Sequence, residues 1–130
     1  MTTFKKVVIF FFLIVSRTLY AQSGEIDSLK AVVSTLREDS TKVSALIDLG
    51  TAYIGLDFTQ ATNYGQQALA LAKASNHQKG MGFAHKLLGI ANAYQGEYLE
   101  ADIQFKAALA VFDSIRFKDG TAQILNNLGS

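Results

Sequence analysis

The chain has 130 residues, of which 49% are hydrophobic and 18% are charged, and it contains no proline, cysteine or tryptophan. This length allows one domain at most, and the lack of cysteine excludes a disulfide framework, a thiolate metal site and a cysteine nucleophile. With a formal net charge of +1, the chain lacks the basic excess of a nucleic-acid-binding domain. The absence of proline, the strongest helix breaker, favours an all-α fold.

Residues 1–21 have the pattern of a secretory signal peptide. Lys5 and Lys6 precede an unbroken apolar run at 7–15, and Ala21 is a small residue suited to cleavage after it. Nine apolar residues rise about 14 Å as a helix, roughly half of a bilayer core, so a membrane span is the less favoured interpretation. A buried N-terminal helix or an uncleaved anchor is the alternative. The segment predicts an exported protein, located in the periplasm or on the extracytoplasmic side of the inner membrane.

Removal of residues 1–21 would change the charge of the chain. The segment holds three of the 12 basic residues and none of the 11 acidic ones, which leaves nine basic and 11 acidic residues, a net charge of −2. A mildly acidic chain without a basic stripe argues against a nucleic-acid partner.

Residues 22–39 are predicted to form a leading capping helix. Its apolar side chains fall on one helical face: Leu29, Val32, Val33 and Leu36. A single helix with one apolar stripe is expected to bury it against the rest of the chain. A polar break follows at 38–40, and Ser40 or Thr41 is expected to start the next helix.

Residues 40–130 contain a sequence repeat. Residues 68–89 align without a gap on residues 108–129 at an offset of 40, and the Leu-Gly pair at 49–50 recurs at 88–89. A fixed period of this length, with two helical stretches in each unit, is typical of a stacked helical array.

The second helical stretch of each unit has a strong helical face. In the second unit this face carries Ala101, Phe105, Ala108 and Phe112, at i, i+4, i+7 and i+11. Gly96, in the turn before it, can adopt the positive φ that such a turn needs, and we expect Phe58 or Tyr98 to close the corner as a packed ring. The first unit has Gly65 where the second has Phe105. We expect a bulky side chain of the leading helix, Leu29, Val33 or Leu36, to fill that space.

These residues resemble the tetratricopeptide repeat family. The resemblance rests on Leu88-Gly89 in a first helix, the turn Gly96-Glu97-Tyr98, and Ala101, Phe105 and Ala108 in a second helix. The chain is similar to a long-period bacterial variant, because its period exceeds the family's usual period of about 34 residues. The resemblance implies a right-handed superhelical array of antiparallel helix pairs, an α-α solenoid. It would have about two and a half repeats behind the leading helix, with the third repeat truncated.

The resemblance also implies a function without catalysis. It points to a protein–protein interaction module that resembles the N-terminal extracytoplasmic region of bacterial sensor proteins of the histidine-kinase type. A free-standing periplasmic scaffold and an accessory repeat region of an exported enzyme are the alternatives. The expected partner is a protein or peptide, with no small-molecule substrate, cofactor, metal or nucleic acid. We expect the chain to be a fragment of a longer protein, the alternative being an array that ends in a dimer contact.

In this family the first helix of each unit lines a concave face that binds a peptide. By match to that pattern, the lining residues are Ser44, Ile47, Asp48 and Thr51 from the first unit, Phe83, Lys86 and Ile90 from the second, and Gln123, Asn126 and Asn127 from the third. The subfamily that clamps a C-terminal carboxylate has Lys and Asn where this chain has Ile47, Thr51 and Leu87. A carboxylate clamp is therefore disfavoured.

No catalytic or metal-binding constellation stands out in the sequence. His77 lies in a polar link and is expected to be a solvated loop residue, and His85 is expected to be a half-buried spacer. Two histidines without cysteines or a flanking acid fall short of a zinc site. The glycine-containing stretch at 79–86 lacks the spacing of a phosphate loop, and Gly80 recurs as Gly120, so the repeat itself explains it.

Overall fold

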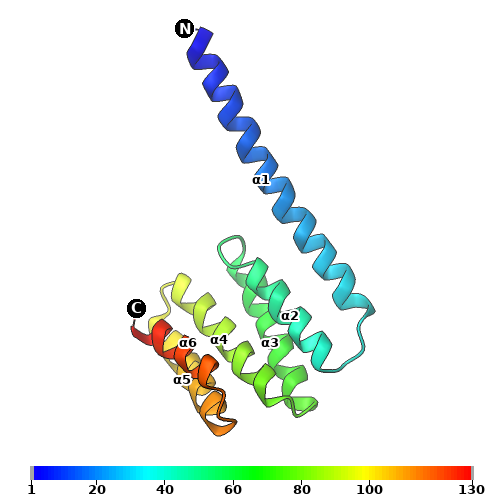
Figure 1. Ribbon diagram of the computed structural model, residues 1–130, viewed down its shortest axis with the longest axis vertical. Coiled ribbons are helices and arrows are strands. Elements are labelled where there is room, and N and C mark those ends of the chain that lie inside the picture. Colours follow the sequence, from blue (N-terminus) through cyan, green and yellow to red (C-terminus); the bar gives the residue numbers. More distant parts are fainter. Residues whose placement is uncertain (1, 130) are drawn as a thin grey trace.

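The computed structural model describes residues 2–129, with the side chains of residues 5–11 and 21–129. Over these residues the fold is all-α, with six helices and no strand (Figure 1). The helices are α1 (Thr2–Thr35), α2 (Ser40–Ala52), α3 (Phe58–Ala74), α4 (Gln78–Tyr94), α5 (Tyr98–Ser114) and α6 (Lys118–Gly129). The prediction of an all-helical fold is confirmed.

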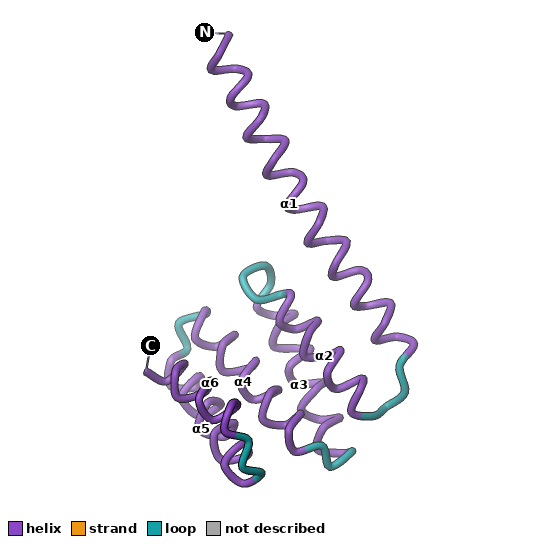
Figure 2. The backbone as a smooth tube through the Cα atoms, viewed as in Figure 1, coloured by secondary structure: helices purple, strands orange, loops and turns teal. Residues whose placement is uncertain are grey.

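Helices α2 to α6 pack in chain order. Each helix packs against the next one, and short turns join them (Figure 2). In addition α2 packs on α4 and α4 packs on α6, whereas the described residues of α3 and α5 make no contact with one another. The pairs α2–α3 and α4–α5 therefore correspond to the two helical stretches that the repeat predicts in each unit.

Helix α1 runs without a break across residue 21, where the sequence predicts a cleavage site, and it projects beyond the other helices in Figure 1. Near its C-terminal end it packs on α2, with Ile26 buried and Val33 half-buried, while Val32 is 47% exposed. The side chains of Val7 and Phe11 are 61% and 70% exposed, so the alternative of a buried N-terminal helix does not hold for this stretch. Among the residues whose placement is described, no helix has the length and apolar character of a membrane span.

The ends of the helices follow from local chemistry. Asp39 caps α2, because its Oδ1 accepts hydrogen bonds from the backbone N–H groups of Thr41 at 2.9 Å and Lys42 at 3.4 Å. Helix α2 accordingly begins at Ser40, as predicted. Gly96 has a φ of 80° in the turn between α4 and α5, which confirms the predicted left-handed turn residue.

The second unit has an aromatic core. Phe112 is fully buried, and its ring meets Phe83 edge-to-face at a centroid distance of 5.1 Å and Phe117 at 5.4 Å. Edge-to-face pairs of this kind stabilise a core beyond the area that they bury. Ala108 and Ile124 complete the same cluster and are fully buried, so helices α4, α5 and α6 share one core.

The space beside Gly65 is filled from the helix that follows, not from the leading helix. A Cβ atom added to Gly65 would lie 2.8 Å from Cδ2 of Leu88 in α4. The prediction that Leu29, Val33 or Leu36 occupies this space is therefore wrong. The reason is geometric: α3 packs against α2 and α4, while α1 packs only against α2 among the described helices.

Two ring positions also differ from the prediction. Tyr98 is 72% exposed and does not close the corner, whereas its counterpart in the first unit, Phe58, is half-buried and stacks on Tyr94 at 5.9 Å. His77 is not a solvated loop residue. It is half-buried at the start of α4, packs against Gly80, and its Nδ1 atom is buried without a hydrogen-bond partner.

Candidate functional site

A groove lies between the first helices of the two units. Its cavity volume is about 430 Å³, and we call it the α2–α4 groove. It is lined by Ile47 and Thr51 from α2, by Ile54 from the turn after α2, and by Phe83, Lys86, Leu87, Ile90 and Tyr94 from α4. The lining is mainly aliphatic and aromatic, with one cationic side chain, which is the composition of a site for an apolar ligand that carries a few polar groups.

Helical spacing explains why these side chains converge. The two α2 residues, Ile47 and Thr51, fall at i and i+4, and the α4 residues extend over three turns of one helical face. Three further lining residues, Ile54, Leu87 and Tyr94, are not among those predicted from the sequence. Tyr94 lies one helical turn after Ile90 in α4, so extending that stripe by one turn would have found it, whereas Ile54 lies in the turn after α2 and no helical stripe predicts it.

The predicted lining residues divide between this groove and other places. Five of them line the α2–α4 groove: Ile47, Thr51, Phe83, Lys86 and Ile90. Gln123 is joined to the set through Lys86, because the Nζ atom of Lys86 lies 2.5 Å from Oε1 of Gln123. Ser44 and Asp48 are exposed on α2 and do not line the groove, and Asn126 is exposed on α6.

Lys86 is the polar centre of the α2–α4 groove. Its side chain is half-buried, its amino group donates to the Gln123 amide oxygen, and it lies 6.0 Å from the centroid of the Phe83 ring. Burial lowers the pKa of Lys86 below its usual 10.5, because desolvation disfavours the charged form. Among the described residues no carboxylate lies within ion-pair distance of this amino group. The groove therefore contains a partly desolvated cation whose hydrogen-bond partner is neutral.

The Thr51 hydroxyl, a second polar group of the lining, is already engaged. The Oγ1 hydroxyl of Thr51 donates to the carbonyl oxygen of Ile47, one turn earlier in α2, at 2.8 Å. Its donor is thus satisfied within its own helix. A ligand in the α2–α4 groove would find the Lys86 amino group and the Tyr94 hydroxyl as polar contacts, with the Gln123 amide bound to Lys86.

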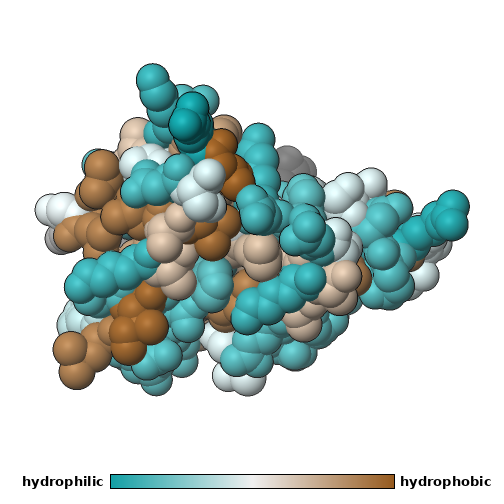
Figure 3. All heavy atoms as spheres, turned by 90° about the horizontal axis from the view of Figure 1, so that it is seen from below, coloured by the Kyte–Doolittle hydropathy of each residue, from teal (hydrophilic) through white to brown (hydrophobic). Residues whose placement is uncertain are grey.

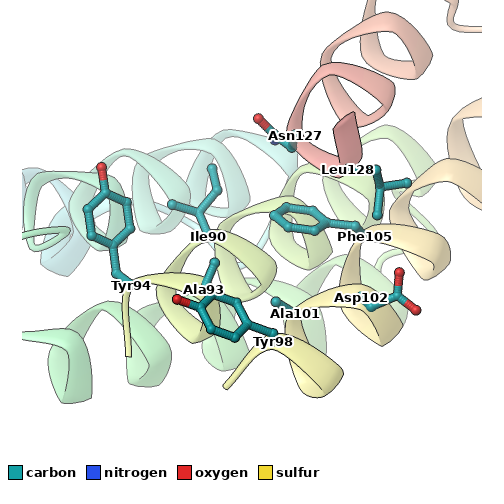
Figure 4. A pocket seen from close by; sticks show the side chains of 9 residues that line it. All are labelled: Ile90, Ala93, Tyr94, Tyr98, Ala101, Asp102, Phe105, Asn127 and Leu128. Carbon is teal, nitrogen blue, oxygen red and sulfur yellow. The ribbon is translucent and has the colours of Figure 1, made fainter. Parts of the chain in front are cut away.

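A second groove lies at the C-terminal end of the described helices. Its cavity volume is about 620 Å³, and we call it the C-terminal groove (Figure 4). It is lined by Ile90, Ala93 and Tyr94 from α4, Tyr98, Ala101, Asp102 and Phe105 from α5, and Asn127 and Leu128 from α6. Ile90 and Tyr94 line both grooves, which are therefore neighbours. The predicted lining residue Asn127 lies in the C-terminal groove, whereas Lys86 lies in the α2–α4 groove.

The described residues show no cluster of metal-binding side chains. Among them no group of three or more His, Asp or Glu side chains is placed to hold a metal ion. His85 is half-buried, and its Nδ1 lies 2.8 Å from Oε1 of Gln104, which joins α4 to α5. This contact makes His85 a packing residue between helices, in agreement with its predicted place as a half-buried spacer.

The chain was compared with protein families, curated proteins and solved structures. No protein-family model matches the chain, and no curated protein or solved structure matches it either.

Proposed function

We propose that the chain is a non-enzymatic protein-interaction module of the tetratricopeptide type, and that the α2–α4 groove holds a segment of a partner protein. The array is a right-handed α-α solenoid of about two and a half repeats. What supports the proposal is the sequence repeat of 68–89 on 108–129, together with helix pairs at the predicted positions and a groove between the first helices of consecutive units.

The observation that carries the proposal is the environment of Lys86. A half-buried amino group with only a neutral amide as partner is under-compensated, and an incoming carboxylate would pair with it. Ile47, Ile54 and Leu87 surround it with apolar surface. The ligand that fits is a peptide with one acidic side chain flanked by aliphatic or aromatic residues. A clamp for a C-terminal carboxylate would need further cations and amides, which the lining lacks.

The proposal also includes export of the protein, with residues 1–21 as its signal peptide. The functional likeness is to the N-terminal extracytoplasmic region of histidine-kinase-type sensor proteins, in which capture of a partner would precede signalling. This part of the proposal rests on the resemblance of the repeat and on the N-terminal pattern of charge and hydropathy.

Titration of the full chain with short peptides tests the groove. Peptides that carry Glu between aliphatic residues are compared with matched peptides that carry Gln instead. A charge-assisted hydrogen bond is worth about 1.5–3 kcal/mol, so we expect about 10- to 100-fold weaker binding for the Gln peptides. The variant Lys86→Glu should lose the preference for Glu.

Lys73→Glu is the matched control, because it makes the same charge change at an exposed position on α3, and it should bind as the unaltered chain does. Thr51→Trp, which puts bulk into the groove from an exposed position, should block both peptides. Equal affinity for Glu and Gln peptides, or equal effects of Lys86→Glu and Lys73→Glu, would move the binding site to another surface.

A further inference from the structure

A polar pocket lies between α3 and the turn that follows α4. Its cavity volume is about 480 Å³, and we call it the α3–α4 pocket. Figure 3 shows apolar and hydrophilic residues side by side on one face of the molecule, but none of the residues that line this pocket is aliphatic, aromatic or cationic. The pocket shares no lining residue with the α2–α4 groove. Its lining includes Thr59, Thr62 and Asn63 from α3, Asn92 from the end of α4, and Gln95 and Glu97 from the turn.

Two of the lining residues bury polar groups that the fold leaves unpaired. Asn92 is only 8% exposed, and its side-chain amide makes no hydrogen bond to any described residue. The Oγ1 hydroxyl of Thr62 is also buried without a partner. Buried polar groups are nearly always hydrogen-bonded, and an exception calls for a water molecule or a ligand that satisfies it. Because Asn92 lines the pocket, a molecule in the pocket can supply the missing partner.

The remaining polar side chains are held in place around the pocket. The backbone carbonyl oxygen of Asn92 accepts hydrogen bonds from the N–H groups of Glu97 at 2.9 Å and Gln95 at 3.1 Å, which fixes the turn. Nε2 of Gln95 donates to a backbone carbonyl in the last turn of α4 at 3.2 Å, so its Oε1 remains as an acceptor. On α3, Oδ1 of Asn63 accepts from the side chain one turn later at 3.3 Å, so its Nδ2 remains as a donor. The pocket therefore presents donors and acceptors together.

The second unit shows that the fold does not require these polar residues. At an offset of 40, Thr59 and Asn63 of α3 correspond to Leu99 and Ile103 of α5, which are 87% and 56% exposed. The same helical face is thus polar in one unit and aliphatic in the next. Since both faces occur in the same paired-helix architecture, the polar set belongs to the pocket and not to the packing of the repeat.

The chemistry of the lining selects the class of ligand. An anion finds no cation in the lining, and the carboxylate of Glu97, which forms no ion pair with any described residue, would repel it. An apolar ligand finds no apolar side chain to pack on. A compact neutral ring with several hydroxyl groups matches the lining. Each hydroxyl can donate to a carbonyl or carboxylate oxygen and accept from an amide N–H group.

We propose that the α3–α4 pocket binds a neutral carbohydrate, with the hydroxyl groups of one sugar ring paired with the amides of Asn92 and Asn63 and with the carboxylate of Glu97. The cavity volume lies within the range of about 300–1,000 Å³ that small-molecule sites occupy. The site is additional to the proposed peptide contact at Lys86 and independent of it, because the two sets of lining residues do not overlap.

Titration of the full chain with simple sugars tests this site. The neutral probes are the methyl glycosides of glucose, galactose, mannose and N-acetylglucosamine, and glucuronic acid is an anionic probe of similar size. Heteronuclear NMR follows the side-chain amide signals of Asn63, Asn92 and Gln95. We expect at least one neutral probe to shift these signals saturably in the millimolar range. Glucuronic acid should bind about tenfold more weakly than that probe, since its carboxylate meets Glu97 without a cation nearby.

Asn92→Leu is the central variant. It exchanges the amide for an aliphatic side chain of similar size, so the bound sugar loses a buried hydrogen-bond partner and should bind about tenfold more weakly. The Tm should not fall, because the Asn92 side chain has no hydrogen bond to a described residue to lose. Gln78→Leu is the matched control at an exposed position at the other end of α4, and it should bind sugar as the unaltered chain does.

The double variant Thr59→Leu/Asn63→Ile keeps the test valid even if Asn92→Leu does not fold. It copies into the first unit the residues that the second unit already carries, and it should weaken sugar binding by at least about tenfold. Lys86→Glu should leave sugar binding unchanged, so failure of the peptide proposal and failure of this one give distinct results.

Three results would overturn the proposal. If none of the four neutral probes gives a saturable shift, the pocket holds water only. Unchanged sugar binding in both Asn92→Leu and Thr59→Leu/Asn63→Ile would put the sugar at another surface. A shift of the same amide signals with calcium chloride, and with no glycoside, would assign the pocket to a cation, because amide and carboxylate oxygens are calcium ligands.

Discussion

His77 and Phe117 occupy equivalent positions in two successive repeat units. We expect the substitution His77→Phe to stabilise the protein. Each ring packs on a glycine three residues later, Gly80 or Gly120. The Phe117 ring packs on Phe83 and on Phe112, and the Lys79 amino group lies 4.2 Å from its centroid, so it buries no unpaired polar atom. By contrast, Nδ1 of His77 is buried without a hydrogen-bond partner. His77 makes no side-chain capping bond at the start of α4, so His77→Phe removes no favourable contact there.

The magnitude follows from two terms of the same sign. A buried polar group without a partner costs about 1–3 kcal/mol, and a half-buried phenyl ring gains up to about 1 kcal/mol by area. His77→Phe should therefore raise the free energy of unfolding by about 1–4 kcal/mol, with a rise in Tm of about 4–8 °C for each kcal/mol in a helical region of this size. Chemical and thermal unfolding followed by circular dichroism measure both quantities.

The reciprocal substitution is the control. Phe117→His removes edge-to-face contacts with Phe83 and Phe112 at centroid distances of 5.9 and 5.4 Å, and it should destabilise the protein by about 1–3 kcal/mol. If His77→Phe lowers the Tm, or if the two substitutions act with the same sign, the two positions are not equivalent packing slots and the repeat alignment in this turn is wrong.

Three further predictions concern a cap, the core and a titrating group. Asp39→Ala should cost about 1 kcal/mol in urea unfolding, because it leaves two backbone donors of α2 without their acceptor; no loss would mean that water replaces the cap fully. Phe112→Ala should cost about 3–5 kcal/mol, since the ring is fully buried, while Leu99→Ala on the same helix, 87% exposed, should change stability little; similar losses for both would contradict the burial pattern. The lowered pKa of Lys86 means that the folded chain releases this proton at a lower pH than the unfolded chain does, so stability relative to Lys86→Met should rise as pH increases through the folded pKa toward 10.5; a constant difference would refute the desolvation argument.

The sequence alone determined the all-helical fold and the order of the paired helices α2 to α5. The repeat period located two helix pairs, since spacing of apolar residues at three and four positions is a local property that each helix carries by itself. Gly96 and its positive φ were predictable for the same reason, because a turn of this kind needs a residue without a Cβ atom. Half of the predicted lining residues meet in the α2–α4 groove because they lie on the stripes that this spacing defines.

Only the tertiary structure decided which side chain fills which space. Leu88 fills the space beside Gly65, whereas in the second unit Phe105 occupies that space itself and leaves the counterpart Leu128 partly exposed. Lys86 meets Gln123 across 37 residues of sequence, and no local pattern pairs them. Helix periodicity sets the direction of a side chain, but the volume available to it depends on the neighbouring helix, which the spacing within one helix does not encode.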